Sequence, residues 1–241
     1  MGGTVNVPVS VIVCAHDEEE NLRQLLPLLQ SQHHLEFEII VVDDCSNDGT
    51  YDFLWKEAQK DPRLKIVHVN SRPGHVNGKK YALTLGIKAA KHDWVLLTDA
   101  DCRPATTEWI HQMAGSFTEQ AAFVIGYSPY YKLPGLLNSF IRFETIITAV
   151  QYFSFALLGA PYMATGRNLA YRKKIFLDKK GFYTHLEVQG GDDDLFVNQH
   201  STNSNTRIVL QPNAIVLSQP KKTWQEFYRQ KIRHLAVGKR Y

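Results

Sequence analysis

The residues best suited to chemistry are acidic side chains that follow apolar segments. Asp99 and Asp101 stand one residue apart, directly after the apolar run that begins at Trp94. Two carboxylates held this close repel each other unless a cation neutralises them. Mg²⁺ and Mn²⁺ prefer such oxygen ligands and often share them with the phosphates of a substrate. The pair therefore indicates a metal–phosphate site, although an Asp-rich turn that caps the next helix would show the same residues.

Other acids follow other apolar or glycine-containing segments. Asp44 ends the segment that starts at Phe37, and three consecutive acids, Asp192, Asp193 and Asp194, follow Gly190 and Gly191. If the chain brings these acids to one rim, a divalent cation and a polar ligand would balance their charge. The sequence has no GxxxxGK[ST] loop and no GxGxxG after its first apolar segment, so the P-loop and the dinucleotide fingerprint are both missing.

The order of elements predicts how these acids are positioned. Apolar, β-branched segments at 9–15, 37–42, 64–69 and 94–99 alternate with amphipathic helical segments. Such alternation requires a parallel sheet, and ligands bind beyond the carboxyl ends of its strands. We therefore predict an α/β fold, Rossmann-like, with a mainly parallel central sheet and helices on both faces.

The second half of the sequence is less regular. We expect helices over 109–117 and 223–237, a strand over 121–126, a long helix from Pro134, and a hairpin formed by 207–210 and 214–217. The chain is thus predicted to be one domain in two parts. Residues 1–103 would form a nucleotide-binding half, and residues 104–241 an acceptor and catalytic half that closes the site.

Composition narrows the class of protein. A net charge of +3 over 241 residues does not argue for nucleic acid as a partner. Cys14, Cys45 and Cys102 lack the spacing of metal ligands and are interpreted as reduced thiols in a cytosol-facing protein. The apolar stretch 145–164 contains Gln151 and Pro161, so we expect a long buried or interfacial helix rather than a membrane span.

The motifs, taken in order, resemble those of family 2 glycosyltransferases with the GT-A fold. The resemblance rests on segments 9–19, 42–50 with Asp44, 78–83, Asp99-Ala100-Asp101, 191–194, and 230–234, which is similar to a QxxRW signature. His234 stands where that signature has Trp, which weakens any expectation of long-chain processivity.

The resemblance implies an inverting transfer from a nucleotide-sugar donor, with UDP favoured through Asp44, and a Mg²⁺ or Mn²⁺ ion held by Asp99 and Asp101. It implies a catalytic base at Asp193 or Asp192, since three consecutive aspartates leave the register open by one residue. Arg167 and Asn168 resemble a turn near the acceptor, although they could equally serve only to hold the turn or the core together. The residues that would contact the nucleotide sugar are Ala15, Asp17, Glu18, Asp44, Lys79, Asp99, Ala100, Gln230 and Arg233.

The same resemblance implies a glycan or lipid acceptor and association with a membrane. We expect the catalytic part of a longer membrane-anchored protein, at the cytoplasmic face, with no nucleic acid as partner. The apolar segment 140–158 and a set of basic residues would suit an anionic leaflet. The basic set is Lys221, Lys222, Arg229, Lys231, Arg233, Lys239 and Arg240.

Two other functions fit parts of the pattern. A nucleotidyltransferase or sugar-phosphate pyrophosphorylase also combines such a sheet with Mg²⁺ and carboxylates, but a glycine-rich basic loop would usually follow its first strand. Here the acids Asp17 to Glu20 stand at that position. A non-catalytic nucleotide-sugar-binding domain is the other alternative, and only an assay of turnover separates it from an enzyme.

Overall fold

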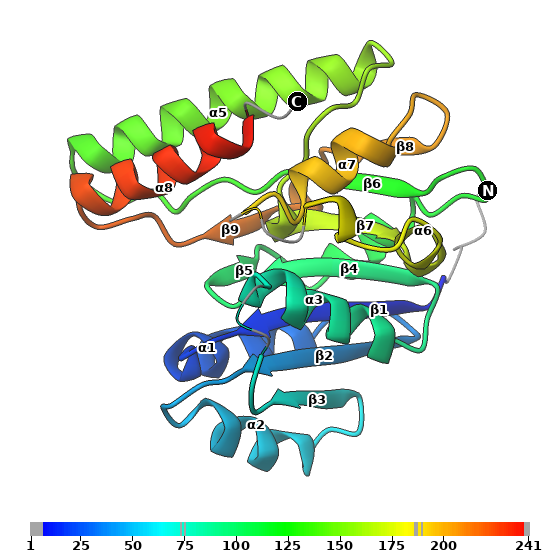
Figure 1. Ribbon diagram of the computed structural model, residues 1–241, viewed down its shortest axis with the longest axis vertical. Coiled ribbons are helices and arrows are strands. Elements are labelled where there is room, and N and C mark those ends of the chain that lie inside the picture. Colours follow the sequence, from blue (N-terminus) through cyan, green and yellow to red (C-terminus); the bar gives the residue numbers. More distant parts are fainter. Residues whose placement is uncertain (1–6, 73, 75, 186–187, 189, 239–241) are drawn as a thin grey trace.

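A seven-stranded sheet runs through the molecule. The computed structural model describes residues 7–72, 74, 76–185, 188 and 190–238. The strands of the sheet are β1 (Val9–Ala15), β2 (Phe37–Asp44), β3 (Leu64–Val69), β4 (Trp94–Asp99), β6 (Phe123–Gly126), β7 (Leu169–Arg172) and β8 (Thr206–Val209). Their order is β3-β2-β1-β4-β7-β6-β8 (Figure 1).

The first four strands are parallel and end together. In the register of the sheet, Ala15 of β1 lies opposite Asp43 of β2, and Cys14 lies opposite Asp99 of β4. β7 is antiparallel to β4 and β6, whereas β8 is parallel to β6. The predicted α/β fold with a mainly parallel sheet is confirmed, and the carboxyl ends of β1, β2 and β4 form one rim.

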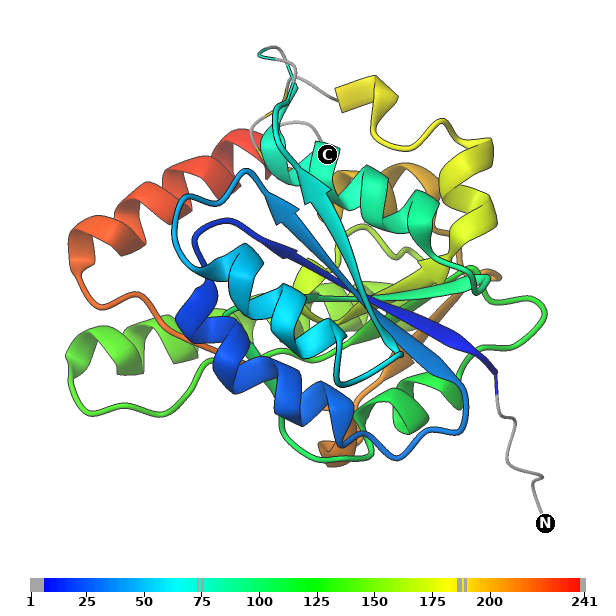
Figure 2. The ribbon, with the colours of Figure 1, turned by 90° about the horizontal axis from the view of Figure 1, so that it is seen from below.

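Helices cover both faces of the sheet, as predicted (Figure 2). One apolar cluster joins the sheet to α1 (Glu19–Gln30), α2 (Thr50–Ala58) and α4 (Trp109–Ala114). The other joins it to α3 (Gly78–Ala89), α5 (Leu136–Leu157), α6 (Lys173–Asp178) and α7 (Asp194–His200). Sequence spacing explains the packing: Leu22, Leu25, Leu26 and Leu29 share one side of α1, and all four are buried.

α5 and α8 (Trp224–Gly238) lie side by side at one end of the molecule (Figure 1). Aromatic contacts join them, since the Phe140 ring of α5 lies 5.6 Å from that of Trp224 and 5.7 Å from that of Phe227 in α8. α5 ends at Leu157, before the positive-φ residue Gly159. In the described part of the chain, no helix is both long and apolar enough to cross a membrane.

The predicted hairpin of 207–210 and 214–217 is wrong. β8 belongs to the large sheet, whereas β9 (Val216–Ser218) pairs with β5 (Cys102–Pro104) in a second, two-stranded sheet. A 3₁₀ turn, Pro212–Ala214, separates the two strands, and the amide of Asn168 donates a hydrogen bond to the Ala214 carbonyl at 2.8 Å. This anchored turn sends the chain from one sheet to the other.

Candidate active site

Two loops at the rim are tied together by hydrogen bonds. The Asp17 backbone N–H donates to Ser46 Oγ at 3.0 Å, and Asp17 Oδ1 accepts from the Asn47 N–H at 2.7 Å. The next residue, Glu18, donates its N–H to Thr50 Oγ1 at 3.0 Å. Asp17 adopts a φ of 55°, a conformation that aspartate tolerates better than most residues. One carboxylate oxygen of Asp17 thus fixes the loop that follows β1 against the loop that follows β2.

Asp44 presents a free carboxylate oxygen at the end of β2. Its Oδ2 accepts a hydrogen bond from Arg72 Nη1 at 2.9 Å, while its Oδ1 is buried and has no partner among the described residues. A buried oxygen without a partner is costly, and a hydroxyl or imide N–H of a ligand would satisfy it. Gly78 makes room for this pair, because a Cβ there would lie 2.0 Å from Arg72 Nη1.

Asp99 and Asp101 meet the requirements of a hard cation. Ligand atoms of Asp99, Asp101 and Cys102 all lie within 4.8 Å of one another. Burial and the negative charge of Asp99 raise the pKa of Asp101, so the pair would gain from a neutralising cation. Burial also raises the pKa of the Cys102 thiol, so this side chain is not ionised for metal binding. The two carboxylates remain, and they provide the oxygen ligands that Mg²⁺ and Mn²⁺ prefer.

Lys79 links the acids of β4 to those of the second half. Its Nζ lies 3.0 Å from Asp99 Oδ1 and 3.3 Å from Asp192 Oδ2. Burial opposes ionisation of Asp99, but the ammonium of Lys79 holds the pKa of that carboxyl below its ordinary value. The Lys79 side chain is 44% exposed, so it also faces solvent at the rim. Ala15 and Ala100, which the sequence suggested as nucleotide contacts, are buried in the core.

Asp193 is separate from this ion-pair cluster. Its Oδ1 accepts from the Asp194 N–H at 2.9 Å at the start of α7, and its Oδ2 accepts from the Gly166 N–H. Burial, reinforced by the charges of Asp192 and Asp194, raises the pKa of Asp193 to about 7. Since Asp192 is paired with Lys79, Asp193 is the acid of the pair better suited to exchange a proton at neutral pH.

A cleft of about 790 Å³ opens at the rim, beside α8. Glu18 and Asp101 lie among its lining residues, together with Arg233 of α8. Three more basic residues, Lys221, Lys222 and Arg229, also line it, so part of the basic set that the sequence suggested for a membrane surface borders this cleft. Lys239 and Arg240 lie outside the described residues. Such a basic wall opposite an acid pair suits a diphosphate bound through a cation.

Gln230 lies apart from that cleft. It faces a second cavity of about 60 Å³ between α5, α8 and the segment around Arg167. Its Nε2 donates to Tyr130 Oη at 3.4 Å. The structure thus brings Asp99, Lys79 and Asp192 into contact, places Glu18, Asp101 and Arg233 around the large cleft, and assigns Gln230 to a neighbouring cavity.

Two residues have positions that the sequence did not indicate. Arg72 lies in an irregular loop after β3, with no motif to signal its pairing with Asp44. Asn168 is fully buried: its Oδ1 accepts from Trp109 Nε1 at 3.0 Å, and its Nδ2 donates to the carbonyls of Tyr127 and Ala214. Asn168 therefore holds three segments together rather than facing an acceptor.

The sequence matches the model of a known family. Residues 10–178 match Glycosyl transferase family 2, which covers more than half of the chain. The chain belongs to glycosyl transferase family 2. This family 2 domain is 30% identical over 243 residues to the probable glycosyltransferase YdaM of Bacillus subtilis (strain 168), covering 97% of this chain and 55% of the relative. It is 27% identical over 190 residues to the 4,4'-diaponeurosporenoate glycosyltransferase of Staphylococcus haemolyticus, covering 75% of this chain and 46% of the relative. The domain spans about half the length of these curated relatives.

Solved structures show the same GT-A fold. The mannosyltransferase PcManGT from Pyrobaculum calidifontis, in complex with GDP-Man and Mn²⁺, has a TM-score of 0.74 and 20% identity, over 99% of this chain and 66% of that protein. S. aureus TarS 1-349 in complex with UDP-GlcNAc has a TM-score of 0.63 and 20% identity, over 95% of this chain and 66% of that one. At 20% sequence identity, the similarity to these two structures is evidence for a shared fold alone.

Proposed function

We propose that this domain transfers a sugar, with inversion, from a nucleotide-sugar donor to a hydroxyl of a glycan or lipid acceptor. The observation that supports it most is the convergence of four features on one rim. These are the unsatisfied oxygen of Asp44, the acid pair Asp99 and Asp101, the ammonium of Lys79, and Asp193 with its raised pKa. Each has a task in such a transfer, and they come from segments far apart in the sequence.

The donor would span the rim from Asp44 to the large cleft. Asp44 Oδ1 would accept a hydrogen bond from the nucleoside, and UDP is our preferred nucleotide because uracil offers an imide N–H. Arg233 and its basic neighbours would face the diphosphate across the cleft. Asp99 and Asp101 would hold Mg²⁺ or Mn²⁺, which when bound neutralises the leaving diphosphate.

Asp193 would act as the general base. Its carboxylate removes the proton from the acceptor hydroxyl, so that the oxygen can attack the anomeric carbon from the face opposite the diphosphate. The Gly166 N–H, which donates to Asp193 Oδ2, fixes the direction of the carboxylate. Lys79 stays between Asp99 and Asp192 and limits their repulsion.

Turnover with water as acceptor tests this function without knowledge of the natural acceptor. The domain is incubated with Mn²⁺ and, in turn, UDP-glucose, UDP-N-acetylglucosamine and GDP-mannose, and the release of nucleoside diphosphate is measured. We expect release from at least one donor, and release at least about a hundredfold slower from the Asp193→Asn variant. Release of pyrophosphate from a nucleoside triphosphate and a sugar phosphate would instead support the nucleotidyltransferase alternative. Tight nucleotide binding without turnover of any donor would support the non-catalytic one.

We further propose that α5 and α8 rest on the cytoplasmic face of an anionic membrane. Large apolar side chains are exposed along both helices, and the most exposed of them are Leu136, Phe143, Val150 and Leu157 of α5 and Tyr228, Ile232 and Leu235 of α8. An apolar face with Trp and Tyr among its members suits the interface between headgroups and acyl chains. The domain carries a net charge of +3, which would favour anionic lipids.

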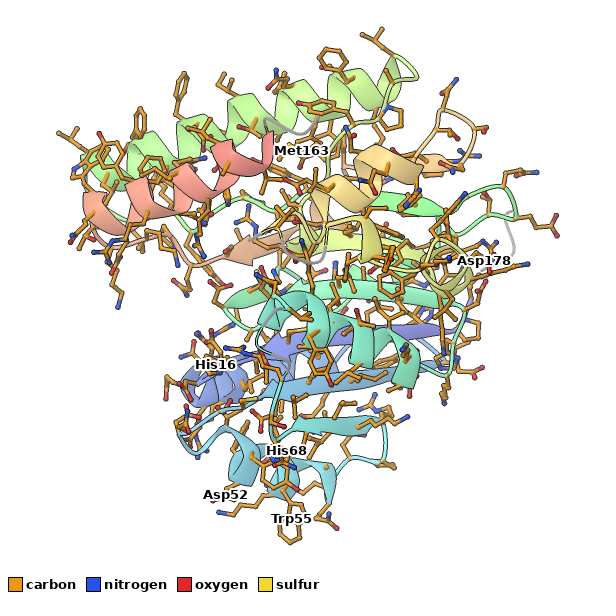
Figure 3. The ribbon with its side chains drawn as sticks, in the orientation of Figure 1. His16, Asp52, Trp55, His68, Met163 and Asp178 are labelled. Atoms are coloured by element: carbon orange, nitrogen blue, oxygen red, sulfur yellow. The ribbon has the colours of Figure 1, made fainter. Side chains whose placement is uncertain are left out.

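Sedimentation with phosphatidylglycerol-containing vesicles tests this location. Phe143 is 62% exposed on α5, and Trp55 is 54% exposed on α2, at the far end of the molecule (Figure 3). We expect a smaller fraction of the Phe143→Ser variant than of the wild-type domain to sediment with the vesicles. The matched Trp55→Ser control should sediment to the same extent as the wild type. Equal binding by both variants, or no binding by the wild type, would contradict the proposal.

A further inference from the structure

The guanidinium of Arg167 is a charged group with no ion-pair partner among the residues that the structure describes. Its Nη1 is buried and has no hydrogen-bond partner within the described part of the chain. The guanidinium stacks on the ring of Tyr130, whose centroid lies 4.5 Å from the Arg167 Cζ. Stacking on an aromatic face leaves the N–H groups in the plane of the guanidinium free to donate. A desolvated donor of this kind is stabilised when a ligand supplies an acceptor.

Arg167 lines the second cavity, the one of about 60 Å³ beneath α5 and α8. Thr165 and Tyr152 share its wall with Gln230 and Lys231. A cavity of this size holds a small polar group rather than a complete sugar ring.

Among the described residues around the cavity, the cation Arg167 lacks an acid that neutralises it. Lys231 forms an ion pair with Glu144 of α5, so these two lining residues neutralise each other. Arg167 forms no ion pair with a described residue. Burial opposes its charge, while Tyr130 and Cys102, followed by Asp99 and Asp101 on the donor side, raise its pKa. A divalent cation bound by those two acids would offset their charge and leave Arg167 to attract an anion into the cavity.

The segment that lines the cavity also contacts the proposed base. Gly166, the neighbour of Arg167 in the chain, donates its N–H to Asp193 Oδ2. A Cβ at Gly166 would lie only 3.1 Å from that same oxygen. A group bound by Arg167 would therefore be held by the same segment, 165–167, that orients Asp193.

We infer that Arg167 binds an anionic group, a phosphate or a carboxylate, on the acceptor. The inference rests on the proposed function and adds the chemical class of its second substrate. A bidentate pair between the guanidinium and two oxygens of the anion would orient the acceptor hydroxyl toward Asp193. The anion could belong to a lipid phosphate or to an acidic sugar, which present the same oxygens to the arginine.

Matched pairs of probes test the inference by calorimetry, with the domain saturated by Mn²⁺ and the nucleoside diphosphate that it binds. Hexyl phosphate against hexanol represents the lipid source, and galacturonate against galactose represents the acidic sugar. We expect at least one anionic probe to bind about tenfold or more tightly than its neutral counterpart. The pair that shows this preference identifies the source of the anion.

Variants then assign the preference to Arg167. Arg167→Gln should lose the preference, Arg167→Lys should retain part of it, and both should bind the nucleotide as the wild type does. Lys56→Gln, which removes one positive charge from the exposed surface of α2, is the control and should keep the full preference. Circular dichroism confirms that each variant is folded.

Three results would overturn the inference. The first is equal binding of anionic and neutral probes by the wild type, and the second is an unchanged preference in Arg167→Gln. The third is a loss of nucleotide affinity in Arg167→Gln, because the guanidinium would then contact the donor rather than the acceptor. Failure of the wild type to bind any nucleoside diphosphate would contradict the proposed function itself. This failure would be detected before the acceptor probes are added.

Discussion

The pKa of Asp193 predicts how the rate of the reaction depends on pH. A general base acts in its ionised form, and burial together with the neighbouring aspartates raises the pKa of Asp193 to about 7. The ionised fraction is then about one eleventh at pH 6 and about ten elevenths at pH 8. We therefore expect kcat to rise about tenfold between these two values, with a midpoint near pH 7.

The assay is the release of nucleoside diphosphate at saturating donor and Mn²⁺, measured from pH 5.5 to 8.5. Asp193→Asn should lower kcat by roughly 10²- to 10⁴-fold and remove the midpoint near pH 7. Asp52→Asn makes the same chemical change at an exposed position of α2 and should leave both the rate and the profile unaltered (Figure 3). A rate that is independent of pH between 6 and 8, or an Asp193→Asn variant with the wild-type profile, would refute the reasoning.

The same carboxyl also links folding stability to pH. Its pKa in the folded protein lies above the ordinary value of 3.8, so the folded state holds the proton more tightly than the unfolded state does. The stabilising contribution of the protonated form is complete below pH 4 and is lost as the pH rises through about 7. Chemical denaturation should therefore show a smaller loss of unfolding free energy between pH 5 and 8 for Asp193→Asn than for the wild type.

Two further substitutions probe the groups around the base. Lys79→Met removes the cation between Asp99 and Asp192, and because the lysine is partly exposed we expect the unfolding free energy to fall by only about 1–2 kcal/mol at pH 7, by chemical denaturation. A stability equal to that of the wild type would show that the ion pairs contribute nothing. Gly166→Ala places a methyl group 3.1 Å from Asp193 Oδ2, so a displacement of a few tenths of an ångström should lower kcat several-fold while the calorimetric Kd for the nucleotide stays constant. A changed Kd with an unchanged kcat would contradict this geometry.

The first half of the fold could be predicted because its sequence is locally consistent. Strands such as β1 and β4 are continuous apolar, β-branched runs, and the helices between them repeat their leucines at helical spacing. When strands and helices alternate along the chain, the strands are parallel and their carboxyl ends lie at the same edge of the sheet. The position of Asp44 and Asp99 at one rim could therefore be predicted from the order of the elements alone. The structure shows in addition that β2 continues through both Asp43 and Asp44.

The second half could not be derived in the same way, because its pairings are not local. β7 enters the sheet between β4 and β6, and β9 pairs with β5, more than 100 residues earlier in the chain. Hydrophobic pattern contains no information on such partners, which explains the wrong hairpin. Contacts between side chains that lie far apart in the sequence could not be predicted either. Examples are the contacts of Arg72 with Asp44 and of Lys79 with Asp192.

The register of the acidic triplet shows what geometry adds. Three consecutive aspartates are equivalent in sequence, so Asp192 and Asp193 were both candidates for the base. The structure pairs Asp192 with Lys79 and orients Asp193 through the Gly166 N–H. Only the three-dimensional neighbours distinguish a carboxylate held in an ion pair from one that can exchange a proton.

Calorimetric titration of the domain with UDP and with GDP, each with and without Mn²⁺, tests the central claim most directly. We predict that at least one nucleotide binds only when the metal is present, because Asp99 and Asp101 repel the diphosphate unless a cation lies between them. Asp101→Ala should abolish that binding, whereas Asp52→Ala on α2 should preserve it. Binding that is equally strong without Mn²⁺, or that survives in Asp101→Ala, would contradict the assignment of the acid pair as the site where metal and donor meet.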